Sequence, residues 1–364
     1  MAPGVGRSAY DATPMNAWYT LHHQQHAGNV EFTEGRYLDG FELPVRAERV
    51  RREFEAAGLG PVQAPPDRGL APILAVHAAD YVEFLQRAWA DWSALGRSHP
   101  ALPMVWQAGA GLPQRVPRHI DGRMGFYAQD AACSIVAGTW TAAYWSAQCA
   151  LAGAHDLLAG APRALAICRP PGHHATARAM GGFCFLNNAA IAAQSLLAGG
   201  LLRVAIVDVD YHHGNGTQAI FWARDDVFFT SLHADPHDDY PYFVGHADER
   251  GEGDGAGFTL NFPLPPGTAA VAWLAALEQA LDAALATRPD AVVVSLGVDT
   301  FERDPISRFA LRSDDYLEIG RRLARAALPT LFVFEGGYAT DEVGLNTVNV
   351  VRGHVAGSAA TIDR

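Results

Sequence analysis

The chain carries five short apolar runs, at residues 164–168, 204–209, 227–230, 291–296 and 330–334. Hydrophobicity within each run is nearly continuous rather than alternating, which is typical of strands covered on both faces in a parallel sheet. Between the runs lie Ala- and Leu-rich segments with helical spacing, at residues 187–197, 271–286 and 314–327. This alternation predicts an α/β fold with an open, mostly parallel sheet flanked by helices on both faces.

Polar motifs follow these runs. The first run leads into Arg-Pro-Pro-Gly-His173-His174, and the second into Asp208-Val-Asp210-Tyr-His212-His213-Gly-Asn215. The later runs lead into Ser231-Leu-His233, Gly-Val-Asp299 and Glu335-Gly-Gly-Tyr338. Open parallel sheets bind ligands beyond the carboxyl ends of their strands. We therefore expect these side chains to gather in one site.

Asp210, His212 and Asp299 form a candidate metal site. Asp210 and His212 are two residues apart at a strand end, so their side chains point the same way, and Asp299 ends a later strand. Two carboxylates and one imidazole suit zinc with an open position for water. An isolated Asp-x-His is more often structural, and the neighbouring His pair and Tyr338 favour the metal site. His213 points elsewhere and is interpreted as a core or supporting histidine.

His173 and His174 follow a rigid Pro-Pro-Gly turn. A satisfied core pair would need a hydrogen-bond partner for each imidazole. The pattern favours acid–base catalysis near neutral pH instead. Tyr338 follows paired glycines, which let the backbone bring its hydroxyl close to a reacting centre, although an ordinary aromatic is the alternative.

The 364 residues, 49% of them hydrophobic, are ample for a large core, and a single domain spanning residues 1–364 is expected. Residues 95–125 are rich in Pro and Gly and lack periodicity. They predict a long loop inserted before a helix near Ala131. A functional role is favoured because the loop carries Val105 and Trp106, which a disordered segment would not need.

The net charge of −12 argues against nucleic-acid binding and suits a cationic substrate, although solubility alone explains it as well. The four cysteines show no C-x-x-C spacing, which indicates buried free thiols in a reducing compartment. The N-terminus lacks an apolar signal region, and no apolar stretch has the length of a bilayer crossing. A cytoplasmic protein without a membrane partner is expected.

These motifs together resemble the histone deacetylase and acetylpolyamine amidohydrolase superfamily, and within it most of all the bacterial acetylpolyamine amidohydrolases. The similarity runs from about residue 37 to residue 353 and includes Gly181-Gly-Phe-Cys-Phe-Leu-Asn-Asn188 and Asp304-Pro305 beside the motifs above. The resemblance implies an arginase-like α/β fold. It also implies zinc-dependent hydrolysis of an N-acetyl amide on a slim cationic amine, such as an acetylpolyamine or an acetyl-lysine-like group.

The resemblance implies a role for each motif residue. Asp210, His212 and Asp299 would bind one zinc ion per chain; His174 would be general base and then general acid; His173 would assist electrostatically, held by Asp208; and Tyr338 would donate to the oxyanion. The expected partner of His174 is Asn215. An uncharged partner favours neutral His174, whereas Asp208 favours a charged His173, so we hypothesise that the two histidines have separated pKa values.

The resemblance also implies two structural potassium sites. The first would use Asp208, Asp210, His212, Ser231 and Leu232. The second, built mostly from carbonyl groups, would lie near Phe221, Arg224, Val227 and Phe258.

For the substrate, the resemblance implies a tunnel walled by Gly182, Phe183 and Tyr240, with Ile306 near its mouth. Asp121 would meet the distal ammonium group, whereas the following segment offers Asp130 and Ala132 where the pattern has another acid. The 95–125 insert would narrow the entrance and contribute to a homodimer.

Three other functions remain as alternatives. Acetyl-lysine in proteins or peptides, or other small amides, would need only a different preference outside the tunnel. A dimanganese ureohydrolase of the same fold would need an additional carboxylate that Asp-x-His-His-Gly-Asn lacks. An inactive acetyl-amine binding protein would be expected to have lost a metal ligand, a histidine of the pair or the tyrosine.

Overall fold

A computed structural model describes residues 14–33, 35–107 and 113–362 of the chain. Within them, an eight-stranded sheet forms the centre of the molecule, and all of its neighbouring strands pair in parallel. In sheet order the strands are β4 (Val62–Gln63), β1 (Asn16–Trp18), β5 (Arg163–Ala166), β10 (Thr330–Phe334), β9 (Ala291–Leu296), β6 (Val204–Asp208), β7 (Val227–Ala234) and β8 (Thr259–Leu264). The predicted fold class is confirmed.

The five predicted strands are all present, with small differences at their ends. The predicted run 227–230 continues to Ala234 in β7, whereas β5 ends at Ala166, two residues before the end of its apolar run. A separate antiparallel hairpin joins β2 (Val30–Thr33) and β3 (Arg36–Asp39).

Ten α-helices are present in the described residues, together with three short 3-10 helices. They are α1 (Val45–Ala57), α2 (Ala71–Leu74), α3 (Ala79–Ser93), α4 (Ile120–Phe126), α5 (Thr139–Leu158), α6 (Asn188–Ala198), α7 (Asn215–Phe221), α8 (Ala270–Ala286), α9 (Asp315–Leu323), α10 (Val343–Ile362), η1 (Leu21–Gln25), η2 (Gly253–Gly255) and η3 (Ala324–Ala326). The predicted helices 187–197 and 271–286 correspond to α6 and α8, and 314–327 divides into α9 and η3.

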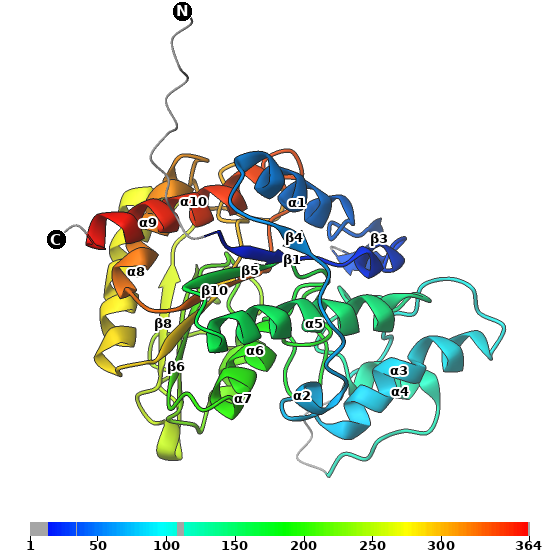
Figure 1. Ribbon diagram of the computed structural model, residues 1–364. Coiled ribbons are helices and arrows are strands. Elements are labelled where there is room, and N and C mark those ends of the chain that lie inside the picture. The colour runs from blue at the N-terminus through cyan, green and yellow to red at the C-terminus, as the bar shows by residue number, and fades with distance from the viewer. Residues whose placement is uncertain (1–13, 34, 108–112, 363–364) are drawn as a thin grey trace, which may run out of the picture.

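Helices cover both faces of the sheet, as Figure 1 shows, with α1, α9 and α10 on one side of the strands and α5, α6 and α7 on the other. The side chains of β9 alternate between the two layers. Val292 and Val294 pack with residues of α8 and α10, whereas Ala291 and Val293 pack with residues of α5 and α6. Burial on both faces explains the continuous hydrophobicity of the strands.

The register aligns the carboxyl ends of the central strands. Asp208 at the end of β6 lies opposite Ser231 of β7 and Ser295 of β9, and Phe334 at the end of β10 lies opposite Leu296 of β9. The loops that follow β6, β9 and β10 therefore leave the sheet at the same edge.

The segment 95–138 differs from the expectation of a loop before a helix near Ala131. It contains the helix α4, and the residues from 127 to 138 form turns and isolated bridges until α5 begins at Thr139. Isolated bridges pair Ala101 with Ile135 and Ala128 with Met180, and residues 129–132 between them form bends. The expected helix near Ala131 is wrong because residues 127–138 form bends, turns and backbone pairs with residues far away in the chain in place of local helical bonds.

The helix α4 was not predicted from the sequence because it contains the helix-disfavouring residues Gly122 and Gly125. Gly125 lies so close to the backbone of Val105 that an added Cβ would be 1.6 Å from the Val105 carbonyl oxygen, so a glycine is needed for this packing. With α3, this region builds a third hydrophobic cluster that includes Phe84 and Met124.

All four cysteines are free and buried, as expected. None of the helices in residues 14–33, 35–107 and 113–362 combines the length and apolar character that crossing a bilayer requires.

Candidate active site

The three predicted metal ligands lie together at the carboxyl edge of the sheet. Asp210 and His212 follow β6 and Asp299 follows β9, all three are buried, and one ligand atom of each lies within 4.8 Å of the others. His212 Nδ1 is 3.2 Å from Asp299 Oδ2 and 3.5 Å from Asp210 Oδ1. The donor set, two carboxylates and one imidazole, fits a divalent cation such as zinc.

Charge and space in this cluster support the fit. Burial, followed by the neighbouring carboxylate of Asp210, raises the pKa of Asp299 to about 7. A cation between the two carboxylates would relieve this repulsion. Gly336 leaves the space open, because a Cβ there would lie 2.4 Å from Asp299 Oδ2 and 2.5 Å from Asp210 Oδ2.

Backbone N–H groups orient the carboxylates. The N–H of Gly336 donates to Asp210 Oδ2 at 2.8 Å, and the N–H of Tyr211 donates to Asp299 Oδ1 at 2.8 Å. Gly336 follows β10, Tyr211 follows β6, and Asp299 follows β9. The loops after these three strands therefore fix the positions of the two carboxylates together.

His173 is paired with carboxylates. Its Nδ1 lies 3.0 Å from Asp208 Oδ2, and its Nε2 lies 3.8 Å from Asp210 Oδ1. Burial lowers the pKa of His173, but the charges of Asp210 and Asp208 outweigh burial and raise the pKa to about 10. The expected partner, Asp208, is therefore in place.

His174 lies beside His173, with ring centroids 4.0 Å apart, but its partner is neutral. Its Nδ1 lies 2.8 Å from Asn215 Oδ1, the expected partner at the start of α7. Burial, together with the positive charges of His173 and His212, holds the pKa of His174 well below its usual value. The pKa values of His173 and His174 are thus shifted in opposite directions.

Tyr338 is fixed by its backbone and by its ring. Its N–H donates to Asp304 Oδ2 at 2.6 Å, while Gly337 before it has a φ of +126°, which glycine adopts without strain. The guanidinium of Arg46 lies 4.5 Å from the centre of the Tyr338 ring, and the Phe183 ring lies 5.6 Å from it.

A cavity of about 300 Å³ opens onto these groups. His174, His212 and Tyr338 line it, and so do all four residues expected to form the tunnel, namely Gly182, Phe183, Tyr240 and Ile306. Its lining also includes the carboxylic acids Glu31, Asp130 and Asp239. The arrangement suits a narrow, cationic molecule.

The wall formed by Gly182 follows from close packing. Gly182 has a φ of +50°, and a Cβ there would lie 2.3 Å from the His174 ring. Phe183 has a φ of +67° in the same turn, which the mutual backbone hydrogen bonds of Gly181 and Cys184 close. The turn therefore presents Phe183 to the cavity and leaves room for His174.

Asp130 connects two walls of the cavity, a role that the sequence did not reveal. Its Oδ2 accepts hydrogen bonds from the Tyr240 hydroxyl at 2.6 Å and from the Gly182 N–H at 2.8 Å. The Tyr240 ring in turn packs edge-on against His174, with centroids 4.9 Å apart. The sequence pattern indicates Asp130 only as a residue that stands, with Ala132, where the family has another acidic substrate contact.

Asp121 is not brought to this cavity. It lies on α4, where its carboxylate forms two hydrogen bonds with the guanidinium of Arg97, and it is not among the described residues that line the cavity. The Arg97 pairing lowers the pKa of Asp121.

The residues expected at the first potassium site lie on β6 and β7 and in the loop after β6. Ser231 is buried opposite Asp208, and its hydroxyl is 3.2 Å from His213 Nδ1 and 2.8 Å from His233 Nδ1, while Leu232 is buried next to it. His213 is thus a buried supporting histidine, as interpreted.

Of the second set, Arg224 and Phe221 meet near the end of α7. The Phe221 carbonyl accepts a hydrogen bond from the Arg224 N–H at 3.0 Å, and the Phe258 carbonyl accepts one from Phe229 at 2.9 Å. Val227 begins β7.

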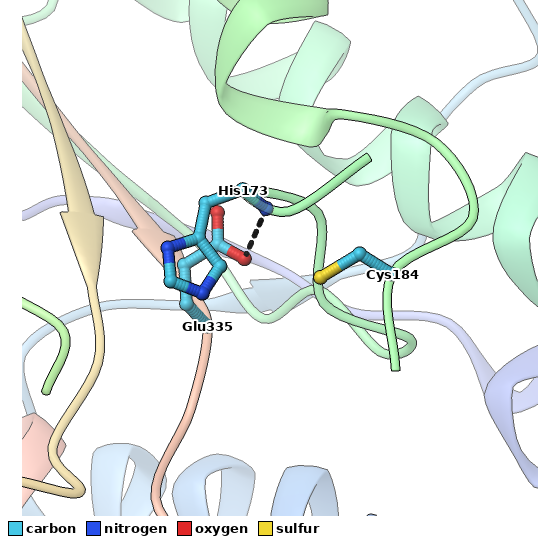
Figure 2. Close-up of side chains that lie close together, drawn as sticks. All are labelled: His173, Cys184 and Glu335. Atoms are coloured by element: carbon cyan, nitrogen blue, oxygen red, sulfur yellow. Dashed lines mark hydrogen bonds between the residues drawn. The ribbon is translucent and has the colours of Figure 1, made fainter. Parts of the chain in front are cut away.

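A second metal-capable group includes His173 of the histidine pair. It consists of His173, Cys184 and Glu335, all buried. Figure 2 shows the hydrogen bond from the His173 N–H to Glu335 Oε2, which is 3.2 Å long, and the Gly172 N–H donates to the same oxygen at 2.6 Å. Burial raises the pKa of Glu335 to about 8. We assign this group to holding the loop that carries His173.

Comparison with known proteins gives consistent matches. The sequence model of the histone deacetylase domain family matches residues 41–354. Acetylpolyamine amidohydrolase 2 of Pseudomonas aeruginosa is 52% identical over 335 residues, which cover 92% of this chain and 97% of that protein. Acetylpolyamine amidohydrolase of Mycoplana ramosa is 46% identical over 343 residues, which cover 94% of this chain and 100% of that protein.

Solved structures agree. The crystal structure of acetylpolyamine aminohydrolase from Burkholderia pseudomallei matches with a TM-score of 0.90 at 39% identity, covering 94% of this chain and 99% of that chain. The HDA15 HD domain matches with a TM-score of 0.76 at 24% identity, covering 94% of this chain and 89% of that chain, which is a likeness of fold.

Proposed function

Because the chain belongs to the histone deacetylase domain family and is most like its bacterial acetylpolyamine amidohydrolases, we propose that it removes acetyl groups from slim cationic amines in a zinc-dependent hydrolysis. One observation carries the proposal. Asp210, His212 and Asp299 form a buried group that suits zinc, and His212 of this group lines a cavity of about 300 Å³ together with His174 and Tyr338.

Asp210, His212 and Asp299 would hold the zinc ion. Zinc bound there would polarise the acetyl carbonyl and acidify a water molecule. We propose that His174 takes the proton of that water at Nε2 and later delivers it to the departing amine nitrogen. A neutral imidazole is required for the first of these actions, and the lowered pKa of His174 favours it.

The other residues stabilise charge. The Tyr338 hydroxyl would donate to the carbonyl oxygen as it becomes negative, and interactions of this kind contribute roughly 10²–10³ in rate. His173, kept positively charged by Asp210 and Asp208, would stabilise negative charge that develops beside it.

The cavity supports the choice of substrate. The aromatic walls of Phe183 and Tyr240 leave room for a linear chain, and Glu31 and Asp130 offer acidic groups to a distal ammonium, whereas Asp239 is already paired with Arg308. The net charge of −12 would further favour a cationic ligand. Asp121 would contribute only if it exchanged Arg97 for the substrate.

We propose further that the chain forms a homodimer through the 95–125 insert. Met104, Val105 and Trp106 support this, because these apolar side chains are 69%, 53% and 44% exposed and a second copy would cover them. We also propose the two potassium sites predicted from the sequence, a single deacetylase domain and a cytoplasmic location.

The proposal is tested by steady-state kcat/KM of the zinc-loaded protein on acetylputrescine, acetylcadaverine, acetylspermidine and an acetyl-lysine peptide. A preference of tenfold or more for the acetylated polyamines, which corresponds to about 1.4 kcal/mol, is expected. A faster peptide would favour the alternative of a protein or peptide deacetylase. An Asp299→Asn variant should lose both zinc and activity.

Metal analysis of the protein as purified, before zinc is added, tests the ureohydrolase alternative. A manganese pair with turnover of a guanidino compound would identify a ureohydrolase. Absence of any amide turnover by the zinc-loaded protein would favour a binding protein.

A further inference from the structure

Gln129 reaches His174 from a distant part of the chain. It lies in the irregular stretch after α4, where its N–H donates to the Met180 carbonyl at 2.8 Å. Its side chain extends to the loop that carries His174 and to the first residue of α7, Asn215. No motif in the sequence marks this residue.

Three hydrogen bonds close a ring through Gln129. Gln129 Nε2 donates to the His174 carbonyl at 2.8 Å, and Gln129 Oε1 accepts from Asn215 Nδ2 at 2.6 Å. Asn215 Oδ1 lies 2.8 Å from His174 Nδ1, which returns the ring to the residue where it began.

The chemistry of this ring allows only one direction of donation. A backbone carbonyl can only accept, so the NH₂ group of Gln129 must face the His174 carbonyl, which leaves the Gln129 oxygen to face Asn215. The NH₂ group of Asn215 must then face Gln129, so the Asn215 oxygen faces His174. His174 must therefore carry its proton on Nδ1. Its Nε2 is left with the lone pair that a base requires.

We propose that Gln129 is a positioning residue that holds His174 in the tautomer protonated at Nδ1. The inference rests on the proposed function, in which His174 takes a proton at Nε2. Without Gln129, the Asn215 amide can rotate by about 180° and offer its NH₂ group to Nδ1, which would favour the tautomer that is protonated at Nε2 and inactive as a base.

The surroundings of Gln129 set the size of the effect. Gln129 is exposed, and with Asn215 it lines a second cavity of about 810 Å³, which also has Trp222 and Glu249 in its lining. Water in this cavity can compete for Gln129, so its loss shifts the tautomer population instead of abolishing one form. A three- to tenfold fall in kcat is the size that one net hydrogen bond gives.

Two variants separate orientation from bulk. Gln129→Met keeps the length of the side chain and removes both hydrogen-bonding groups. Gln129→Glu loses the donor to the His174 carbonyl but keeps an acceptor for Asn215 Nδ2, so it should keep the Asn215 amide in its orientation although it adds a charge. Because Gln129 is exposed, both variants should fold.

The direct readout is the tautomer of His174, measured by long-range ¹H–¹⁵N NMR of ring nitrogens in histidine-labelled protein, with and without zinc, and assigned by loss of the signal in His174→Gln. Wild type and Gln129→Glu should carry the His174 proton on Nδ1, and Gln129→Met should show both tautomers. In parallel, Gln129→Met should lower kcat three- to tenfold with KM changed less than twofold and full zinc content, and Gln129→Glu should lower kcat less than Gln129→Met does.

If His174 in Gln129→Met keeps the proton on Nδ1 as in wild type, the inference is overturned, even if kcat falls. The tautomer is read without turnover. A wild-type protein that hydrolyses no acetylated amine would therefore contradict the proposed function while leaving this test of Gln129 intact.

Discussion

At the scale of single residues, the partner of each histidine determines its character. His173 and His174 are adjacent and equally buried, but Asp208 meets one ring and Asn215 meets the other. A charged partner favours imidazolium, whereas an amide does not. The adjacent positions can therefore supply a fixed positive charge and a neutral base in the same small volume.

Replacing Asn215 with Asp should make His174 more basic. The carboxylate would raise the pKa of His174, so neutral His174 would appear only at higher pH, and the acidic limb of the kcat/KM profile should move upward by about one pH unit or more. The pH–rate profile of zinc-loaded Asn215→Asp measures this shift. An unchanged acidic limb would contradict the assignment of His174 as the base.

Removing the Tyr338 hydroxyl should slow the reaction without disturbing the metal. The Tyr338→Phe variant keeps the ring packed on Arg46, so zinc content should equal that of wild type, while kcat should fall about 10²–10³-fold. Metal analysis and kcat measure the two effects. The control is Tyr37→Phe, which alters an exposed tyrosine on β3. Wild-type rates for Tyr338→Phe would show that the hydroxyl stabilises no oxyanion.

The motif residues could be predicted from the sequence because their types and spacing reveal their chemistry. Asp210, His212 and Asp299 each follow a recognisable strand. Gln129 and Asp130 could not be predicted in the same way, because their importance comes from contacts with residues far away in the chain, such as Asn215 and Tyr240.

At the scale of elements, a buried ion network attaches α1 to the loops of the site. Arg46 on α1 donates to the carbonyl groups of Gly337 at 2.6 Å and Glu335 at 2.5 Å, and to Glu42 at 2.8 Å. Arg169 donates to the same Glu42 oxygen at 2.8 Å. A helix on one face of the sheet thus supports the loop that positions Tyr338.

Neutralising Glu42 should therefore be costly. In Glu42→Gln, two buried guanidinium groups would lose their shared carboxylate, and the free energy of unfolding should fall by about 3–5 kcal/mol. Urea unfolding measures the change. The matched control is Glu55→Gln, which breaks an ion pair with Arg51 at a half-exposed site and should cost less than about 1 kcal/mol. Equal effects of the two variants would mean that the buried network adds no special stability.

Strands were easier to predict than the segment between α3 and α5. Double-sided burial leaves a continuous apolar run for each central strand, whereas α4 contains Gly122 and Gly125, and the stretch after it pairs with Met180. Local propensity carries no information about such distant pairing.

At the scale of the whole molecule, several buried histidines remain neutral. Burial lowers the pKa values of His23, His26, His77 and His233 to about 4. An unfolded histidine has a pKa of 6.5, so between pH 6.5 and 4 the unfolded chain binds protons that the folded protein does not. Stability is therefore full above pH 6.5 and falls as the pH decreases towards 4.

His77 offers a test of this acid sensitivity. The Nε2 atom of His77 accepts a hydrogen bond from the Asn187 N–H at 2.9 Å. Because His77→Gln removes a titratable imidazole, it should reduce the slope of the unfolding free energy against pH by about 1.4 kcal/mol per pH unit between pH 6.5 and 4. Denaturant unfolding of the metal-free protein at several pH values measures the slope. The exposed His155→Gln is the control, and equal slopes for both variants would contradict the argument.

The fold as a whole could be predicted from the alternation of apolar runs with helical segments and from the polar motifs that follow the apolar runs. The shape of the cavities could not, because their walls come from loops with little regular pattern, including the turn at Gly182 and the stretch through Asp130.

Tyr240 lines two neighbouring cavities. The cavity at the candidate site and the larger one beyond it share Asp130, Tyr240 and Tyr242 in their linings. A smaller side chain at position 240 would enlarge both cavities on their shared side, which would favour molecules with a bulky side arm. Tyr240 is thus one of three residues that belong to the walls of both cavities, and the shapes of the molecules that each cavity admits depend on the size of its side chain.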